Sequence, residues 1–539
     1  MNRSAHGLSQ ALVVFFAVLI SAGALAAQTP APRTTLVEQS PSQNTTALPP
    51  PHGFQQFIKN GKLQLSLNDA IFLALANNTD IQVDQSQVDT AKAAIDAART
   101  LFDPTVNAVF NTQRSTESSF SEAAVAPTLS GLTQEYSLGY SQTFETGTNV
   151  QTFVDATKFS SNVSFGFVNP SVFGTVSVQI TQPLLRGRGL LPNRGPIIIA
   201  QRNLEQSRAE FRQQVAGVML NVVSQYWNVV QDRENLDVAQ SLLAQAQKSY
   251  DHDKEALEKG ALPPLDIFRT ESEVASRRVS EIQAEYDVKE AEDRFRNFLG
   301  ADIDPNIRAL ELDLTEAPEP VGDLLTVDIA TELQKALVNR PDLEAQRLQV
   351  VNDDLNIKIA HNGLEPQLSL SAMYSGYGLN TTTNGPFLEA LDQTFGFSQP
   401  TYGGGLTLTL PIKNYAAKSA YATAQVSKRR DLYTDRQLRQ QIGLQVADAV
   451  HDLEQSKLTM EAAKIALNLA QKNLQAEQRK YELGAETLFV LLETQTELAQ
   501  AEQSVIQAQI GYQVAVASVY YSTGELLGNY NVEIAGLTK

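Results

Sequence analysis

The sequence predicts an α+β fold in which very long helices alternate with short, two-faced strands. One helical pattern runs from Pro196 to Lys259 without a break, and a second spans about 415–483. Between the helices lie segments in which apolar residues alternate with small polar ones, as is typical of β-strands. The order of helix, strands, long helix, glycine turn and helix then occurs a second time.

The repeat is visible residue by residue, so we interpret the chain as an internal twofold duplication. A shift of 224 positions needs no gap and aligns Gly260 with Gly484, Ala261 with Ala485, Thr270 with Thr494 and Gly300 with Gly524. A shift of 262 positions aligns Asn77 with Asn339, Asp80 with Asp342 and Pro104 with Pro366. Both halves are therefore expected to fold alike.

Composition and charge limit what the protein can do. The chain has 539 residues, a formal net charge of −18, one tryptophan and an aromatic content of 7%, so large globular cores are not expected. The negative charge argues against nucleic acid or an anionic membrane surface as a partner. Because there is no cysteine, disulfides, thiolate metal sites, cysteine nucleophiles and lipidation of an N-terminal cysteine are excluded.

The N-terminal residues predict export from the cytoplasm. Arg3 precedes an apolar run from Ala11 to Ile20 and then the sequence Ala24-Leu25-Ala26, which is the pattern of a cleaved secretory signal. A Pro-rich leader that is expected to be disordered follows, up to residue 62. No other stretch approaches the roughly 18 to 20 apolar residues of a membrane helix, so any membrane-spanning part must consist of strands.

The alternating segments predict strands with one apolar and one polar face. Val106, Ala108 and Phe110 oppose Asn107 and Asn111, directly after Pro104. The same alternation precedes Pro183, follows Pro366 and precedes Pro411. It is typical of outer-membrane β-barrels. The alternative is a soluble sandwich, which the absence of another apolar partner for these strands disfavours.

The two strand regions differ in length. The segment between Pro104 and Pro183 is 34 residues longer than the segment between Pro366 and Pro411, and the extra residues about 134–158 alternate like a hairpin. This hairpin either adds two barrel strands per chain or forms an extracellular flap. We favour the flap, because the diameter of the helical part limits the width of the barrel.

The long helices predict lateral packing around two turns. A helix of about 64 residues is roughly 95 Å long and requires partners along its length. Gly260 and Gly484 supply the positive φ that can end the helices, and Thr487 is placed to cap the helix that follows. Each glycine is therefore predicted to mark a tip at which the chain reverses.

In this order, the doubled motifs resemble the TolC-like outer-membrane efflux channel family over about residues 63–530. The motifs are LFDPTVNAVF and LEPQLSLSA, VQITQPLLRG and LTLTLPIKN, and KGALPPLDI and YELGAETLFVLL. The resemblance implies a homotrimer, with a β-barrel in outer-membrane lipid and a periplasmic α-helical coiled-coil barrel of roughly 100 Å. It further implies docking to a periplasmic adaptor and an inner-membrane transporter of the RND or ABC type. No catalysis, cofactor or metal is implied, and drug efflux and protein secretion both remain open.

The resemblance also assigns candidate residues near the tips. Asp266 and Tyr481 match a pair that holds the periplasmic mouth closed, although Glu486 stands where the family has a basic residue. Val490 and Glu493 match two acidic positions of the bore, so that one carboxylate ring becomes apolar and the ring of Glu493 attracts cations. The tip turns that would dock the adaptor contain Gly260, Ala261, Gly484 and Ala485.

Other features carry less weight. Asp251 to Asp253 resemble a metal cluster, but consecutive helical residues do not share a face, so we interpret them as solvated surface. A trimeric structural fibre or adhesin and a soluble periplasmic coiled-coil protein are the alternative classes. The former would not need paired tips, and the latter would not need an apolar face on every strand.

The predicted organisation is a signal peptide (1–26), a leader (27–62), helices (63–103), strands with the inserted hairpin (104–183), a long helix, tip and return helix (184–300), an equatorial linker (301–325), helices (326–365), strands (366–411), a second long helix, tip and return helix (412–524) and a tail (525–539).

Overall fold

The computed structural model describes residues 52–118, 128–162, 168–259, 265, 267–301, 304–320, 322–381, 386–397, 399–483 and 485–532. The predicted signal peptide, most of the leader and the end of the tail lie outside these residues. Contacts divide the chain into two compact units. The sheet unit contains 92–202 and 351–429, and the helical unit contains 203–350, 430–532 and the preceding residues up to 91.

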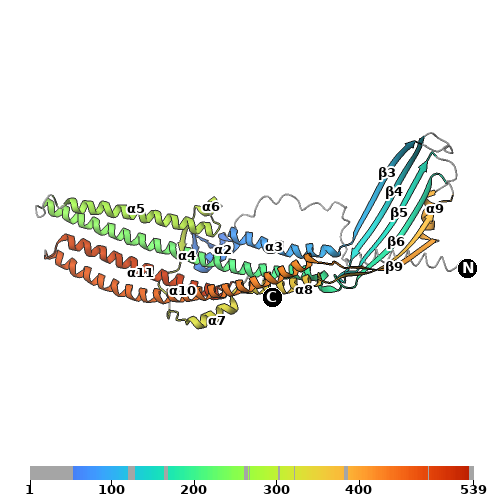
Figure 1. Ribbon diagram of the computed structural model, residues 1–539. Coiled ribbons are helices and arrows are strands. Elements are labelled where there is room, and N and C mark those ends of the chain that lie inside the picture. The colour runs from blue at the N-terminus through green and yellow to red at the C-terminus, as the bar shows by residue number, and fades with distance from the viewer. Residues whose placement is uncertain are drawn as a thin grey trace. The chain divides into compact units, whose positions relative to one another are not determined.

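The sheet unit is built on one six-stranded antiparallel sheet (Figure 1). Its strands, in order across the sheet, are β3 (Thr105–Ser118), β4 (Thr128–Thr143), β5 (Asn149–Ser161), β6 (Ser171–Pro183), β8 (Gln367–Leu379) and β9 (Gln399–Thr409). The preference for a flap is wrong. Within residues 134–158, positions 134–143 belong to β4 and 149–158 to β5, and these strands pair with each other and with β3 and β6.

The register gives this sheet two continuous and different faces. Across all five strand pairings, each residue lies opposite one of the same parity, even with even and odd with odd, from Val106 with Tyr140 to Leu368 with Leu408. The even face carries mainly valine, leucine, alanine and aromatic side chains, whereas Asn, Gln, Ser and Thr dominate the odd face. The alternation seen in the sequence is therefore kept in register through all six strands.

A short helix that the sequence analysis missed lies on the sheet. Helix α9 (Pro386–Phe395) occupies the connection between β8 and β9 and packs on β6 and β8. Its ten residues lie within the segment 366–411, for which only strands were predicted, and a helix this short is specified by tertiary packing more than by sequence pattern.

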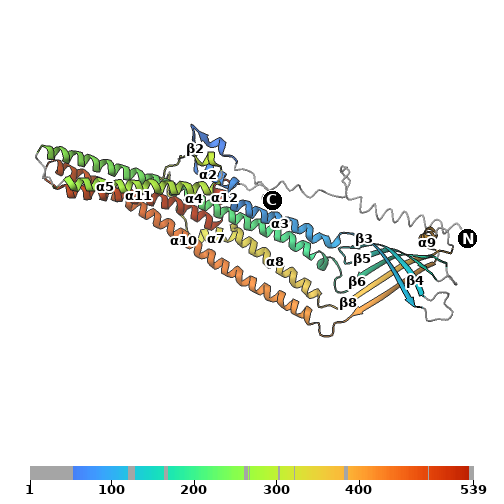
Figure 2. The ribbon, with the colours of Figure 1, turned by 90° about the horizontal axis from the view of Figure 1, so that it is seen from above.

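The main helices form two corresponding series, each with two shorter helices followed in the chain by two longer ones. The first contains α2 (Leu67–Asn77), α3 (Thr79–Arg99), α4 (Leu190–Glu258) and α5 (Ile267–Phe298), and the second contains α7 (Ile329–Asn339), α8 (Pro341–Asn362), α10 (Tyr415–Glu482) and α11 (Leu488–Thr523). Helix α4 has 69 residues and α10 has 68. In the helical unit, α4, α5, α10 and α11 run alongside one another (Figure 2). Among the described residues, none of the helices is long and apolar enough to cross a bilayer.

Helix α4 begins earlier than predicted. Its first residue is Leu190, and Pro196 lies inside the helix. Proline lacks a backbone N–H, so Pro196 removes one helical hydrogen bond near the start without ending the helix.

A small sheet in the helical unit corrects the predicted leader and linker. It contains β1 (Ile58–Lys59), β2 (Lys62–Leu65) and β7 (Glu311–Leu314), with β2 and β7 parallel. A 3₁₀ turn, η1 (Phe54–Phe57), precedes it, and the Phe54 side chain is 1% exposed. The disordered leader therefore cannot extend to residue 62. Two separated segments, each with too few residues to predict a strand, pair only in the folded chain.

The two helix junctions in the helical unit are built alike. Gly300 follows α5 with φ 67°, and a Cβ there would lie 2.9 Å from the carbonyl oxygen of Asn77. Gly524 follows α11 with φ 78°, and a Cβ there would lie 3.1 Å from the carbonyl oxygen of Asn339. These are the residues that the two sequence shifts align.

Candidate functional site

The tip-side ends of α4 and α10 are joined by a partly buried hydrogen bond. The Tyr481 hydroxyl of α10 donates to Oδ1 of Asp253 on α4, at 3.3 Å. Asp253 is 2% exposed, so the interpretation of residues 251–253 as solvated surface is wrong for this residue. Buried Ala246 lies seven residues earlier on the same face of α4, and this spacing could have shown that Asp253 faces inward.

Burial and charge both act on the Tyr481 hydroxyl. They raise its pKa to about 12, because burial disfavours the phenolate and the Asp253 carboxylate repels it. The Nδ1 atom of His252 lies 3.3 Å from the same Oδ1 of Asp253, and the His252 ring centre lies 6.2 Å from that of Tyr481. The hydroxyl therefore stays protonated and donating at neutral pH.

The structure describes only part of the predicted tips. Gly260, Ala261, Asp266 and Gly484 lie outside the described residues, so a bond between Asp266 and Tyr481 stays a prediction. The Ala485 amide donates to the carbonyl of Lys480 at 2.8 Å.

The prediction that the side chain of Thr487 caps α11 is half right. Thr487 is the N-cap residue, but its side chain makes no capping bond. The Thr487 amide instead donates to the carboxylate of Glu486 at 3.0 Å, which keeps that carboxylate beside the start of α11.

The predicted bore residues lie on α11, close to its start. Val490 is half-buried and Glu493 is exposed. Glu493 forms no ion pair with a described residue of its own chain. A ring of Glu493 requires further copies of the chain.

A pair of buried threonines repeats on the two return helices. Thr270 of α5 and Thr494 of α11 are buried, and each hydroxyl donates to a carbonyl of its own helix, at 3.1 and 2.8 Å. Nearby, Arg277 of α5 donates to Thr496 of α11 at 2.6 Å. The return helices are therefore tied together close to the tips.

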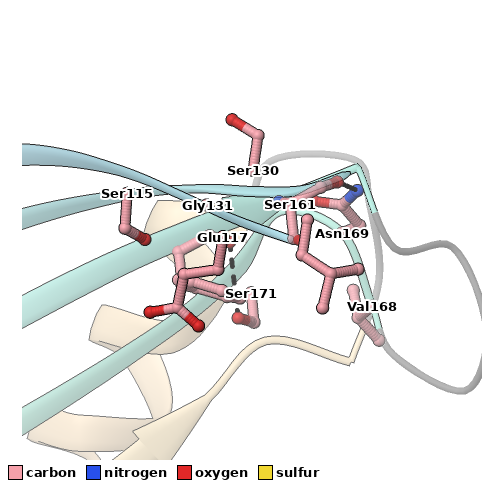
Figure 3. A pocket seen from close by; sticks show the side chains of 10 residues that line it. Ser115, Glu117, Ser130, Gly131, Ser161, Val168, Asn169 and Ser171 are labelled. Carbon is pink, nitrogen blue, oxygen red and sulfur yellow. Dashed lines mark hydrogen bonds between the residues drawn. The ribbon is translucent and has the colours of Figure 1, made fainter. Parts of the chain in front are cut away.

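The odd face of the sheet carries a cavity at the end of the strands where β3 and β4 are joined (Figure 3). Side chains of Ser115, Glu117 and Ser171 line it, and Asn169 closes one side by bonding the backbone of Ser161 at 2.6 and 3.2 Å. Within the described parts of the chain, no group of three or more acidic, histidine or cysteine side chains is placed to hold a metal ion. Leu129, Phe159 and Val168 also line the cavity, so it combines apolar side chains with hydroxyl groups and one carboxylate.

A two-faced antiparallel sheet, combined with paired helices of nearly 70 residues, defines the class of outer-membrane exit channels. The family described as "Outer membrane efflux protein" matches residues 70–301 and 333–525. The chain belongs to this family, which confirms the resemblance and disfavours the fibre and the soluble protein. It is a family of transport channels.

Curated relatives share low identity with the chain. It is 25% identical over 330 residues to the pyoverdine export outer membrane protein OpmQ of Pseudomonas aeruginosa, covering 60% of this chain and 64% of OpmQ. It is 22% identical over 488 residues to the probable efflux pump outer membrane protein TtgC of Pseudomonas putida, covering 90% of this chain and 87% of TtgC.

Solved structures share the fold. The channel CusC superposes with a TM-score of 0.63 at 16% identity, over 92% of this chain and 99% of CusC. The outer-membrane channel OprN gives 0.62 at 17% identity, over 92% and 98%. The open state of the MtrE channel of Neisseria gonorrhoeae gives 0.61 at 17% identity, over 85% and 89%.

Proposed function

We propose that three copies of this chain form one passive exit duct of a tripartite efflux or secretion system, set in the outer membrane and extending into the periplasm. Membership in the efflux family supports this role. Relatives of the chain are named for pyoverdine export, antibiotic efflux and toluene efflux, so we assign the choice of substrate to the inner-membrane pump.

The observation that carries the proposal is the up-and-down order of six strands with two unpaired edges. Strands β3, β5 and β8 run away from the helix-connected end of the sheet, and β4, β6 and β9 run towards it. The edge strands β3 and β9 therefore point in opposite directions, and both are exposed along their whole length. Strand β9 of one copy can pair with β3 of the next in an antiparallel way, which removes the open edges.

Closure by three copies gives a barrel of eighteen strands, six from each chain. Barrel diameter grows roughly linearly with strand number, so this barrel is about half again as wide as one of twelve strands. The even face then meets lipid and the odd face lines an aqueous lumen. The apolar and polar composition of the two faces supports this orientation.

At the other end of the duct, the tips act as the gate and as the docking site. The bond between Tyr481 and Asp253, with Asp266 as a further acceptor, holds the mouth closed. Three Glu493 side chains with Val490 beside them form the narrow ring. The turns at 260–261 and 484–485 contact the periplasmic adaptor, and a transporter of the RND or ABC type engages with it.

Closure between copies can be tested by disulfide trapping, because the chain has no cysteine. Val106→Cys on β3 is combined in turn with Gly404→Cys, Leu406→Cys and Leu408→Cys on β9, all on the even face. We expect one pair to give oxidation-dependent covalent trimers in membranes, together with cation-preferring channels in planar bilayers. A monomer without conductance would contradict the proposal. Labelling of both faces of β4 and β5 from water would contradict it too, because these two strands would then lie outside the barrel and leave it with twelve strands.

A further inference from the structure

Helix α9 is seated on the apolar face of the sheet. The Phe387 ring centre lies 5.9 Å from that of Tyr136 on β4, and just beyond the helix Phe397 lies 5.2 Å from Tyr374 on β8. Both tyrosines are even-numbered. The helix therefore covers the face that, in the proposed barrel, is turned towards lipid and away from the lumen.

Three glycines of the even face, Gly174, Gly376 and Gly378, let α9 lie close to the strands, and we call this contact surface the glycine seat. A Cβ at Gly174 would lie 2.6 Å from Thr394 Oγ1, one at Gly376 would lie 2.6 Å from the Thr394 carbonyl oxygen, and one at Gly378 would overlap Ala390 and Thr394. Gly174 and Gly378 are direct partners in the sheet. Thr394 is fully buried. The close approach of helix and strands therefore depends on the missing side chains, so the docking of α9 is specified by the sequence.

The outward side of α9 carries two exposed apolar side chains and one carboxylate. Leu388 is 75% exposed and Phe395 is 42% exposed. They share one side of the helix with Asp392, at a spacing of i, i+4 and i+7. Between α9 and strands β3 to β5 lies a groove, lined mainly by Phe110, Tyr136, Leu138, Val154, Ala156 and Leu391.

We propose that α9 and this groove form a site for the acyl chains of bilayer lipid in the outer leaflet. The inference rests on the proposed function, which turns the even face to the membrane. The groove continues the apolar part of that face, and the face carries tyrosines at positions 136, 374 and 402, a residue type that is enriched where membrane-facing strands meet headgroups. At roughly 15 Å the helix is too short to cross a bilayer, and it lies in the interface with Leu388 and Phe395 towards the hydrocarbon.

A lipid occupant explains the observations better than a protein partner. The site lies at the end of the strands away from the helix connections, where the proposed barrel meets the outer leaflet. A soluble partner would need to displace lipid from a groove that continues the membrane face. Asp392 at the margin of the apolar side is placed for the headgroup layer, where a carboxylate stays hydrated.

The test uses single-cysteine variants of the full chain, labelled with an environment-sensitive fluorophore and reconstituted in phosphatidylcholine vesicles that contain nitroxide lipids. The probes are Leu388→Cys and Phe395→Cys on α9, Leu370→Cys on the even face of β8, and Ser369→Cys on its odd face. We expect shallow nitroxides to quench positions 388 and 395 at least threefold more than position 369, and deeper nitroxides to quench position 370.

The outcomes separate this inference from the proposed function. If position 370 is quenched but positions 388 and 395 are quenched only by aqueous iodide, α9 does not bind lipid and the barrel proposal stands. If position 370 is not quenched by lipid, the membrane orientation of the sheet is wrong and both proposals fail.

A second variant tests the glycine seat. Gly378→Val should displace α9 and reduce lipid quenching at position 388, whereas Gly403→Ala, on the odd face with no atom within 4 Å of the added Cβ, should leave it unchanged. Equal quenching in both variants would contradict the role of the seat.

Discussion

The two halves of the chain agree closely at the helix junctions and differ in the sheet. Gly300 and Gly524 have the same positive φ and approach the aligned residues Asn77 and Asn339. Between their prolines, however, the first half makes four strands and the second makes two strands and α9. At the junctions the backbones of two helices are in close contact, so extra residues cannot be inserted there. An antiparallel sheet can accept one added hairpin, because its two edge strands keep their directions.

Within the conserved junction, one aligned position differs in chemistry. Asn78 donates to the carbonyl of Phe298 at 3.1 Å, and Arg340 donates to the carbonyl of Ser522 at 3.4 Å. The shifts of 262 and 224 positions align both pairs. The same contact between helices is therefore made by a neutral amide in one half and by a charged guanidinium in the other.

The largest expected effect comes from breaking this contact in the second half. Arg340 is buried and bonds both carboxylate oxygens of Asp342, at 3.1 and 2.6 Å, and Gln445 at 2.8 Å. Arg340→Ala should lower the free energy of unfolding of the helical unit by about 3 kcal/mol, because it leaves a partly buried carboxylate without its partner. Urea titration followed by far-UV circular dichroism measures this.

The matched control is Asn78→Ala in the first half. Asn78 caps α3 by accepting from the Asp80 amide at 2.9 Å, so its loss should cost about 1 kcal/mol. Equal costs for the two variants would mean that the charge of Arg340 adds nothing to the junction.

Replacing either of the two junction glycines should lower the free energy of unfolding by a smaller amount, which is the same at both junctions. Gly300→Ala and Gly524→Ala each place a Cβ at positive φ and close to a backbone, which should cost about 1 to 2 kcal/mol. The two variants should differ by less than about 0.5 kcal/mol if the junctions are equivalent. Gly322→Ala, also at positive φ but with no atom near the added Cβ, separates conformational strain from contact. A large difference between the costs of Gly300→Ala and Gly524→Ala would mean that the two junctions are not equivalent.

The sequence predicted the parts of the fold that depend on local pattern. The breaks at Pro104 and Pro366, the alternating strands and the two long helices follow from periodicity and from residues with restricted φ. The pairing of β2 with β7 and the seat of α9 on Gly174 and Gly378 depend on residues far apart in the chain, and neither segment has enough residues for its own signal.

At the candidate site, too, the sequence analysis missed a contact between residues far apart in the chain. Tyr481 was singled out from the resemblance, but its observed acceptor, Asp253, was dismissed because the adjacent residues were judged together as one cluster. Residues of a helix must be assigned to faces one at a time, since neighbours in sequence point in different directions. The burial of Ala246 on the same face is the signal that favours Asp253.

At the two tips, as at the two junctions, aligned positions carry residues of different chemistry. A variant of Tyr481 tests whether this difference affects gating. Its aligned partner in the first half is Leu257, which has no hydroxyl group to donate. Tyr481→Phe should raise the open-to-closed ratio of the channel about fivefold, the factor that a net hydrogen bond of about 1 kcal/mol provides. Single-channel recording measures the ratio, with Tyr286→Phe as an exposed-hydroxyl control. Unchanged gating would remove Tyr481 from the latch.

A last difference between the two tips is a change of stability with pH, to which only the second tip contributes a tyrosine at this aligned position. Folding raises the pKa of Tyr481 from 10.0 to about 12, so the folded chain holds this proton when the unfolded chain has lost it. The stabilisation is complete below pH 10 and is lost as the pH rises towards 12. Tyr226 and Tyr530 also have pKa values raised to about 12 by burial, so the difference between the parent and Tyr481→Phe isolates the tip. We expect the parent to lose stability more steeply between pH 10 and 12. Parallel curves would mean that burial and the nearby Asp253 carboxylate do not raise the pKa of Tyr481.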